Sequence, residues 1–167
     1  STGVIGGAIV SAPLDLEGSA ETLAKPSRAV YMRHLLQALR KRIKAKNFQF
    51  PDAIDVKPLA SIKTFHEFDQ HYTAPIHGFP SVKEYWHTCS GIHFVDRIRV
   101  PILILTALDD PFLSPSCIPH SAASSSQFII LETPRYGGHV GFIDSLHLRR
   151  TWLEKRLQRF VLEISRA

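Results

Sequence analysis

The sequence predicts an α/β fold in which about three parallel strands are flanked by helices. A β-branched apolar run lies near the start of the chain, and a continuous apolar run, Ile102–Ala107, is typical of a strand covered on both faces. From this second run onward the pattern is strand, helix, strand, loop and helix, which favours a parallel sheet. With 167 residues, of which 44% are apolar, the chain can form one hydrophobic core.

The first half of the chain contains a short strand and a long helix. The run from Gly3 to Ser11 predicts a buried strand that ends at Ala12-Pro13. Pro26-Ser27 opens a helix over residues 27–46, with Ser27 as the expected N-cap. The apolar residues of this helix that we expect on its core-facing side are Val30, Leu35, Leu36, Leu39 and Ile43.

Residues 47–98 form a segment that prolines divide into short pieces. The prolines are Pro51, Pro58, Pro75 and Pro80, and aromatic and histidine residues are dense between them. Such a composition predicts short helices and loops that form a lid. We therefore expect one partial domain over residues 1–167, with residues 26–96 inserted as a cap.

The last third of the chain predicts the rest of the sheet. After the strand Ile102–Ala107, we expect a short helix and loop within residues 115–126 and a third strand over 127–132. A glycine-rich loop follows at residues 136–142. A final helix is predicted from the spacing of its apolar residues, with Asp144 or Ser145 as its cap, and these apolar residues are Leu153, Leu157, Phe160, Val161 and Ile164.

Charge and cysteine content limit the classes of function. The formal net charge is +5, and the basic residues lie mostly on the two predicted long helices. A solvated helix face is the favoured interpretation and no nucleic acid is expected, while an anionic membrane surface stays open. Two cysteines without a CxxC spacing favour a reducing compartment such as the cytoplasm. The apolar runs fall short of the ~20 residues that span a bilayer.

Two segments that follow predicted strands carry residues suited to catalysis. Asp109-Asp110 follows the strand Ile102–Ala107, and His139 follows the third strand. Functional groups gather at the carboxyl ends of parallel strands, and acid followed by histidine is the chain order of a Ser-Asp-His hydrolase triad. In such a triad the carboxylate orients the imidazole, which takes the proton of the serine.

The residues also allow two other kinds of chemistry to be considered against this triad: metal binding and thiolate catalysis. His66-Glu67 and His71 resemble a zinc-binding helix, but histidines five residues apart leave one helical face, so no metal or other cofactor is expected. Catalysis by a thiolate would need Cys117 beside His139. We instead expect Cys117 to pack as a small buried apolar residue.

Several segments resemble the YheT-like branch of the α/β hydrolases over nearly the whole chain. The matching segments are Val10–Leu16, His77-Gly78-Phe79 with Tyr85-Trp86, Ala107–Phe112 and Gly137–Phe142. This resemblance implies a serine esterase or lipase of carboxylic esters. It implies Asp110 as the triad acid, His139 as the base, and Asp109 as a helper that caps the following turn.

The expected nucleophile is not found in the sequence. No serine has glycine two residues away on both sides, as a Gly-x-Ser-x-Gly elbow requires. By the resemblance the elbow and the oxyanion loop lie upstream of Ser1, so we expect the C-terminal half of a hydrolase that is inactive alone. The strand at Gly3–Ser11 would then have an open edge, which could pair with the missing half or with a second copy.

The aromatic residues of the cap leave two interpretations open. Phe68, Phe79, Tyr85 and Trp86 could line a pocket for the acyl group of a small-molecule or lipid ester, or they could form the cap's own core. A non-enzymatic module that binds a protein or a polyanion, through the open edge or the basic helix, is the alternative to the enzyme.

Overall fold

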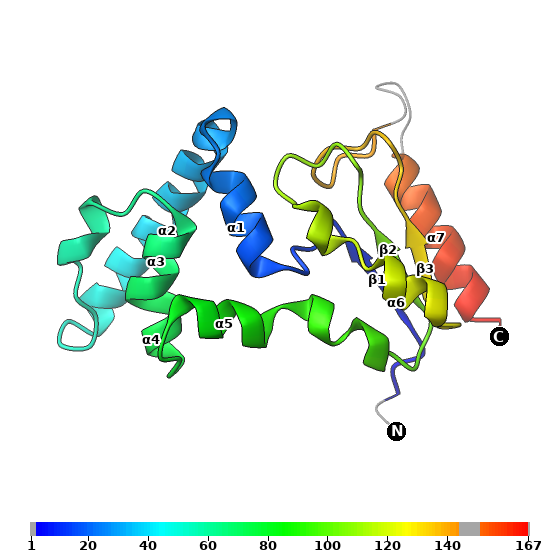
Figure 1. Cartoon of the computed structure of the whole chain (residues 1–167), viewed down its shortest axis with the longest axis horizontal. Coiled ribbons are helices and arrows are strands. Elements are labelled where there is room, and N and C mark those ends of the chain that lie inside the picture. Colours follow the sequence, from blue (N-terminus) through cyan, green and yellow to red (C-terminus); the bar gives the residue numbers. More distant parts are fainter. Residues whose placement is uncertain (1–2, 144–150, 167) are drawn as a thin grey trace. The chain divides into compact units, whose positions relative to one another are not determined.

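A computed structural model describes residues 3–143 and 151–166 of the chain, and Figure 1 shows it along the sequence. The chain divides into two compact units. The sheet unit comprises Ser1–Asp15 and Ser90–Ala167, and the helical unit comprises Leu16–Cys89. The helical unit therefore starts and ends earlier in the sequence than the predicted insertion 26–96, whose role as a cap stays a prediction.

The sheet unit contains three parallel strands, as the sequence predicts. They are β1 (Gly7–Val10), β2 (Ile102–Leu105) and β3 (Ile129–Glu132), in the order β1-β2-β3. Gly7 is level with Ile102 in one pair, and Ile102 with Ile129 in the other. All carboxyl ends therefore lie at the same edge of the sheet, where a parallel sheet gathers its functional groups.

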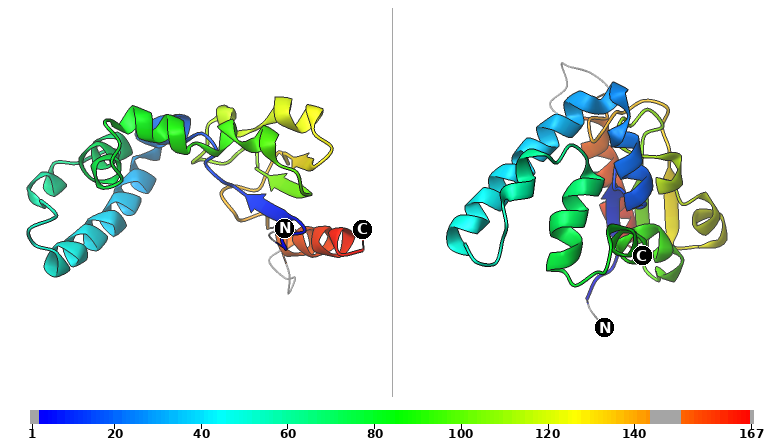
Figure 2. Two further views of the ribbon diagram at one scale, coloured as in Figure 1. Left: turned by 90° about the horizontal axis from the view of Figure 1, so that it is seen from below. Right: turned by 60° about the vertical axis from the view of Figure 1, so that its left-hand side comes forward.

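Helices flank both faces of this sheet. The helix α6 (His120–Ser125) connects β2 to β3, and α7 (Trp152–Ile164) follows β3; Figure 2 shows them on opposite sides. Because side chains alternate along a strand, Ile104 packs into the apolar cluster that includes Ala122 of α6, whereas Leu105 packs into the cluster that includes Trp152 and Leu153 of α7. The central strand is thus buried on both faces, as its continuous apolar sequence predicts.

The strands are shorter than the sequence predicts. β1 begins at Gly7, not at Gly3, and β3 begins at Ile129, not at Gln127. Gly7 is level with Ile102 on β2, and the residue before Ile102 is Pro101. Pro101 has no N–H to donate, although its carbonyl accepts from Gly7 N at 3.0 Å. The ladder between β1 and β2 therefore cannot extend toward the start of the chain.

The ends of two helices also differ from the predictions. Ser27 lies in a 3₁₀ turn, Pro26–Arg28, and the N-cap of the following helix is Arg28. The predicted caps Asp144 and Ser145 of the last helix lie outside the described residues. The observed cap of α7 is Thr151, whose side chain accepts from Glu154 N while the Glu154 side chain accepts from Thr151 N. This reciprocal pair is a capping box, which a Thr-x-x-Glu sequence favours.

The helical unit contains α1 (Leu16–Ala24), α2 (Ala29–Gln49), α3 (Phe65–Phe68), α4 (Ala74–Ile76) and α5 (Val82–Cys89). A π-helical turn, Asp69–Thr73, joins α3 to α4. Two side chains connect separate segments of this unit by hydrogen bonds. The Arg40 guanidinium donates to the carbonyls of Leu59 and Ile62, and the Trp86 indole donates to Asp69 Oδ2 at 2.9 Å.

Val30 does not take the position predicted for it on α2. The buried residues of this helix are Met32, Leu36 and Ile43, whereas Val30 is 79% exposed. At 100° per residue, Val30 lies on the side of the helix opposite to Met32 and Ile43. None of the described helices is both long enough and apolar enough to cross a membrane.

Candidate active site

The carboxylate of Asp110 is buried where the chain leaves β2. Only 1% of its side chain is exposed, and both of its oxygens accept hydrogen bonds. Oδ1 accepts from Phe112 N at 2.9 Å, and Oδ2 lies 2.9 Å from His139 Nδ1. An acceptor in this position favours the tautomer of His139 that carries its proton on Nδ1.

The imidazole of His139 is partly exposed and lies against an aromatic ring. Its side chain is 30% exposed, and its ring stacks on Phe112 with centroids 4.3 Å apart. Phe112 therefore covers one face of the imidazole, and Asp110 fixes one ring nitrogen. The other nitrogen, Nε2, is therefore the one that can exchange a proton with a substrate or a nucleophile.

The loop that carries His139 has an unusual backbone. Gly138, Val140 and Phe142 all have positive φ angles, of 57°, 59° and 44°. Such angles suit glycine but are strained for a β-branched residue such as Val140, at a cost of about 1–3 kcal/mol. Ser11, which directly follows β1, also has a positive φ, and its Oγ accepts from Val140 N at 3.3 Å. The three non-glycine residues with positive φ in the described chain thus lie together at this edge of the sheet.

Asp109 does not have the role predicted for it. Instead of capping the turn after β2, its Oδ1 accepts from Gly137 N at 2.9 Å and from Gly138 N at 2.8 Å. The following turn is capped by Asp110, through Phe112 N. Asp109 therefore holds the histidine loop from across the sheet edge, while Asp110 holds the histidine ring.

Two further residues support the site and were not singled out from the sequence. They are Phe112, which stacks on the imidazole, and Ser11, which binds the backbone of Val140. The position of Ser11 at the end of a strand next to β2 is the one signal in the sequence that could have identified it.

The four aromatic residues predicted to bind substrate all lie in the helical unit. Phe68 and Trp86 are buried, Phe68 next to the ring of Tyr72 and Trp86 in a cluster with Ala20 and Val82. Phe79 and Tyr85 are half-buried and contact each other, with ring centroids 5.4 Å apart. Burial raises the pKa of the Tyr85 hydroxyl, and the charges of Asp69 and Cys89 raise it further. Their role in substrate binding stays a prediction.

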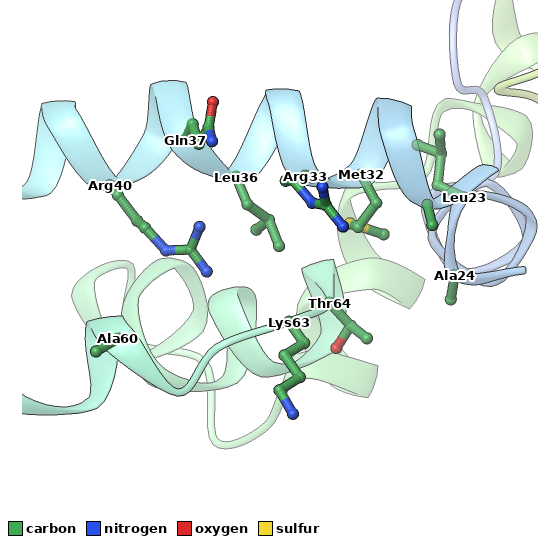
Figure 3. A pocket seen from close by; sticks show the side chains of 11 residues that line it. Leu23, Ala24, Met32, Arg33, Leu36, Gln37, Arg40, Ala60, Lys63 and Thr64 are labelled. Carbon is green, nitrogen blue, oxygen red and sulfur yellow. The ribbon is translucent and has the colours of Figure 1, made fainter. Parts of the chain in front are cut away.

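A pocket of about 570 Å³ opens in the helical unit between α2 and the residues around Lys63 (Figure 3). Leu23, Met32 and Leu36 provide apolar surface, and Arg33, Arg40 and Lys63 provide positive charge. No carboxylate lines it, and none of the four predicted aromatic residues does.

His66 and Cys117 take part in packing. Within the described chain no three His, Cys, Asp or Glu side chains lie close enough to hold a metal ion. The rings of His66 and Trp86 instead pack in a T-shaped arrangement, with centroids 5.6 Å apart. Cys117 is completely buried, and its Sγ donates to the carbonyl oxygen of Asp15, whereas Cys89 is exposed.

The chain is similar to known proteins along most of its length. YheT of Escherichia coli (strain K12) is 36% identical over 152 residues, which are 89% of this chain and 44% of YheT. YheT is a member of the α/β hydrolases, and the parallel sheet of this chain is consistent with part of that fold. Mouse phospholipase ABHD3 is 27% identical over 143 residues, 84% of this chain and 35% of that protein.

A yeast relative matches a shorter part of the chain. The medium-chain fatty acid ethyl ester synthase/esterase 2 of Saccharomyces cerevisiae is 37% identical over 100 residues, 60% of this chain and 22% of that enzyme. The chain thus spans less than half the length of each of these three relatives. No protein-family model matches it, and no solved structure matches it.

Asp109 can be tested as a positioning residue for the loop that carries His139. Asp109→Ala removes the acceptor of two backbone N–H groups, and we expect it to lower the free energy of unfolding by about 1–2 kcal/mol. We also expect the His139 ring nitrogens, observed by ¹⁵N NMR, to lose the pattern of a single Nδ1–H tautomer.

Asp109→Asn is the matched control, because its amide oxygen can still accept from Gly137 N and Gly138 N. We expect this variant to keep the tautomer pattern. If Asp109→Ala leaves the imidazole signals unchanged, the histidine loop is held by other contacts and the positioning role is wrong.

Proposed function

We propose that the complete protein hydrolyses carboxylic esters by a Ser-His-Asp mechanism, with His139 as general base and Asp110 as the acid that orients it. The observation that supports this most directly is the 2.9 Å contact between Asp110 Oδ2 and His139 Nδ1 at the carboxyl edge of a parallel sheet. The names of the relatives, a phospholipase and a fatty acid ethyl ester synthase/esterase, favour an ester of an acyl chain as substrate.

The reaction would proceed in two steps. A serine from outside these 167 residues attacks the ester carbonyl carbon while His139 Nε2 accepts the serine proton. The imidazolium then donates this proton to the leaving oxygen, so that the alcohol departs and an acyl-enzyme remains. Water attacks the acyl-enzyme with His139 as base again, which releases the carboxylic acid and restores the serine.

Asp110 would remain ionised through both steps. Its carboxylate holds Nδ1–H and stabilises the imidazolium that forms when the serine proton is accepted. Phe112, which stacks on the ring, limits rotation of the imidazole. The strained loop that carries His139 is consistent with such a role, because backbone strain clusters at functional sites.

The serine is proposed to come with the polypeptide that pairs with β1. Within the described chain β1 has one strand neighbour, β2, and Ala8 on β1 is exposed, as are the large apolar side chains of Val4 and Ile5 before it. An open apolar strand edge favours pairing with another strand. We propose that this strand belongs to the nucleophile-bearing half, and that a second copy of the chain can occupy the edge in its absence.

The helical unit is proposed to act as the cap, with Phe68, Phe79, Tyr85 and Trp86 as candidates for contacting the acyl group. A reducing compartment such as the cytoplasm is proposed for the protein, since the described structure contains two cysteines as thiols. The second candidate function is a binding module without catalysis, which the charge on α2 favours.

Complementation tests the proposed reaction. The chain is combined with the N-terminal half of YheT, and hydrolysis of p-nitrophenyl esters and co-elution in gel filtration are measured. We expect neither half to be active and the complex to release p-nitrophenol, with no release when the nucleophilic serine of the added half is replaced by alanine. If the halves do not associate, they are fused covalently; a folded fusion without esterase activity would contradict the proposal.

A further inference from the structure

Positive charge is concentrated on α2 and the residues next to it. The segment 25–50 contains eight Lys and Arg residues and no Asp or Glu, whereas the whole chain has 20 basic and 15 acidic residues. These basic residues are Lys25, Arg28, Arg33, Arg40, Lys41, Arg42, Lys44 and Lys46. The segment therefore carries a net positive charge that no acidic residue within it offsets.

The outward side of α2 combines this charge with exposed apolar groups at both ends. Residues three or four apart share a helix face, and such a row runs from Val30 through His34, Gln37, Lys41 and Lys44 to Phe48. All of these residues are exposed, Val30 by 79% and Phe48 by 89%, and Phe50 just beyond the helix is exposed too. At the rise of an α-helix, Val30 and Phe48 lie about 27 Å apart.

A solvated helix face does not account for this combination. Arg40 and Lys44, and also Arg42 and Lys46, are like charges four residues apart, which disfavours an isolated helix. Exposure of the apolar side chains of Val30 and Phe48 to water is also unfavourable. A surface that supplies negative charge along the helix and an apolar layer beneath would compensate both costs.

We propose that α2 docks the protein on the surface of an anionic lipid bilayer, with Lys41 and Lys44 against the headgroups and Phe48 inserted at the boundary of the acyl chains. Lys and Arg residues are drawn to anionic lipid, and each strengthens binding about fivefold. Aromatic side chains favour the interface between headgroups and hydrocarbon. A nucleic acid would match the cations but would leave the aliphatic Val30 exposed, so a bilayer fits the surface better.

The pocket beside α2 is lined mainly from a different side of the helix and is not part of the docking surface. Arg33 and Lys63 lie at this pocket together with the apolar side chains of Met32 and Leu36, as Figure 3 shows. The docking proposal does not depend on the proposed hydrolase activity.

Sedimentation with lipid vesicles tests the docking surface on the full chain. We expect binding to vesicles of phosphatidylcholine mixed with phosphatidylserine, loss of binding at high salt, and no binding to phosphatidylcholine alone. The double variant Lys41→Gln/Lys44→Gln should lower the affinity roughly 25-fold, about fivefold for each cation. Phe48→Ser should lower it at least about fivefold without changing the far-UV circular dichroism.

The matched control is Lys57→Gln/Lys83→Gln, which removes the same charge from exposed positions outside α2. This pair should bind like the unchanged chain, within about twofold. Equal loss in the control, or equal binding to neutral vesicles, would overturn the proposal. Tighter binding to duplex RNA than to the mixed vesicles would assign the surface to nucleic acid, and a lipid-free dimer that Phe48→Ser dissociates would assign it to a second copy; either result also overturns it.

Discussion

Replacement of Asp110 by asparagine is expected to lower kcat for the proposed ester hydrolysis by about 10⁴-fold in the complemented protein. The structure explains why an isosteric change should be so damaging. Phe112 N donates to Oδ1, so an asparagine would keep its oxygen there and turn its NH₂ group toward His139 Nδ1. A donor at that place favours the tautomer protonated on Nε2, which cannot accept the serine proton.

The measurement compares kcat of Asp110→Asn, His139→Ala and Asp109→Asn in the same complex. We expect both of the first two to lose most of the activity, and His139→Ala to lose at least as much as Asp110→Asn, because the histidine transfers the proton itself. Asp109→Asn makes the same chemical change one residue earlier and retains an acceptor for the histidine loop, so its kcat should stay within about tenfold of the unchanged protein. Retention of more than a tenth of the activity by folded Asp110→Asn would show that this carboxylate is not the acid.

The meeting of Asp110 and His139 could be predicted because it follows from chain order and strand position. In a parallel sheet residues that directly follow neighbouring strands are brought to one edge, whatever the details of the loops. The different contacts of Asp109 and Asp110 could not be predicted from chain order and strand position. Which of two adjacent carboxylates points at the imidazole and which at the loop depends on backbone geometry at the end of β2, and both alternatives have the same sequence pattern.

The elements of the fold were predicted better than their ends. β2 was identified from its continuous apolar run, but the start of β1 is set by Pro101 on the partner strand, a contact distant in sequence. Ser27 has the right residue type for a cap, yet Pro26 begins a 3₁₀ turn that moves the cap to Arg28. Val30 is apolar but exposed, because the core-facing side of α2 is fixed by Met32, Leu36 and Ile43.

Truncation of Phe142 is the second change from which we expect a large effect. Phe142 is 4% exposed and packs with Leu105 and Ala107, and its ring centroid lies 5.9 Å from that of Trp152 on α7. Phe142→Ala should lower the free energy of unfolding, measured in urea, by about 3–5 kcal/mol, because it leaves a cavity between the sheet and α7. Tyr136→Ala in the same loop is the control, since Tyr136 is 70% exposed and its loss should cost less than about 1 kcal/mol.

Phe142 should also affect the position of His139 beyond its effect on stability. Its N–H donates to Gly137 O at 2.9 Å, and a Cβ atom at Gly137 would lie only 2.5 Å from its ring, so the two ends of the histidine loop are in close contact. The strained φ of Val140 lies between these ends and persists only while they are held. With the ring removed, the loop can relax and Nδ1 can leave Asp110, so kcat per folded molecule should fall as well. A variant that is destabilised but retains full activity per folded molecule would mean that Asp109 and Asp110 suffice to hold the imidazole in place.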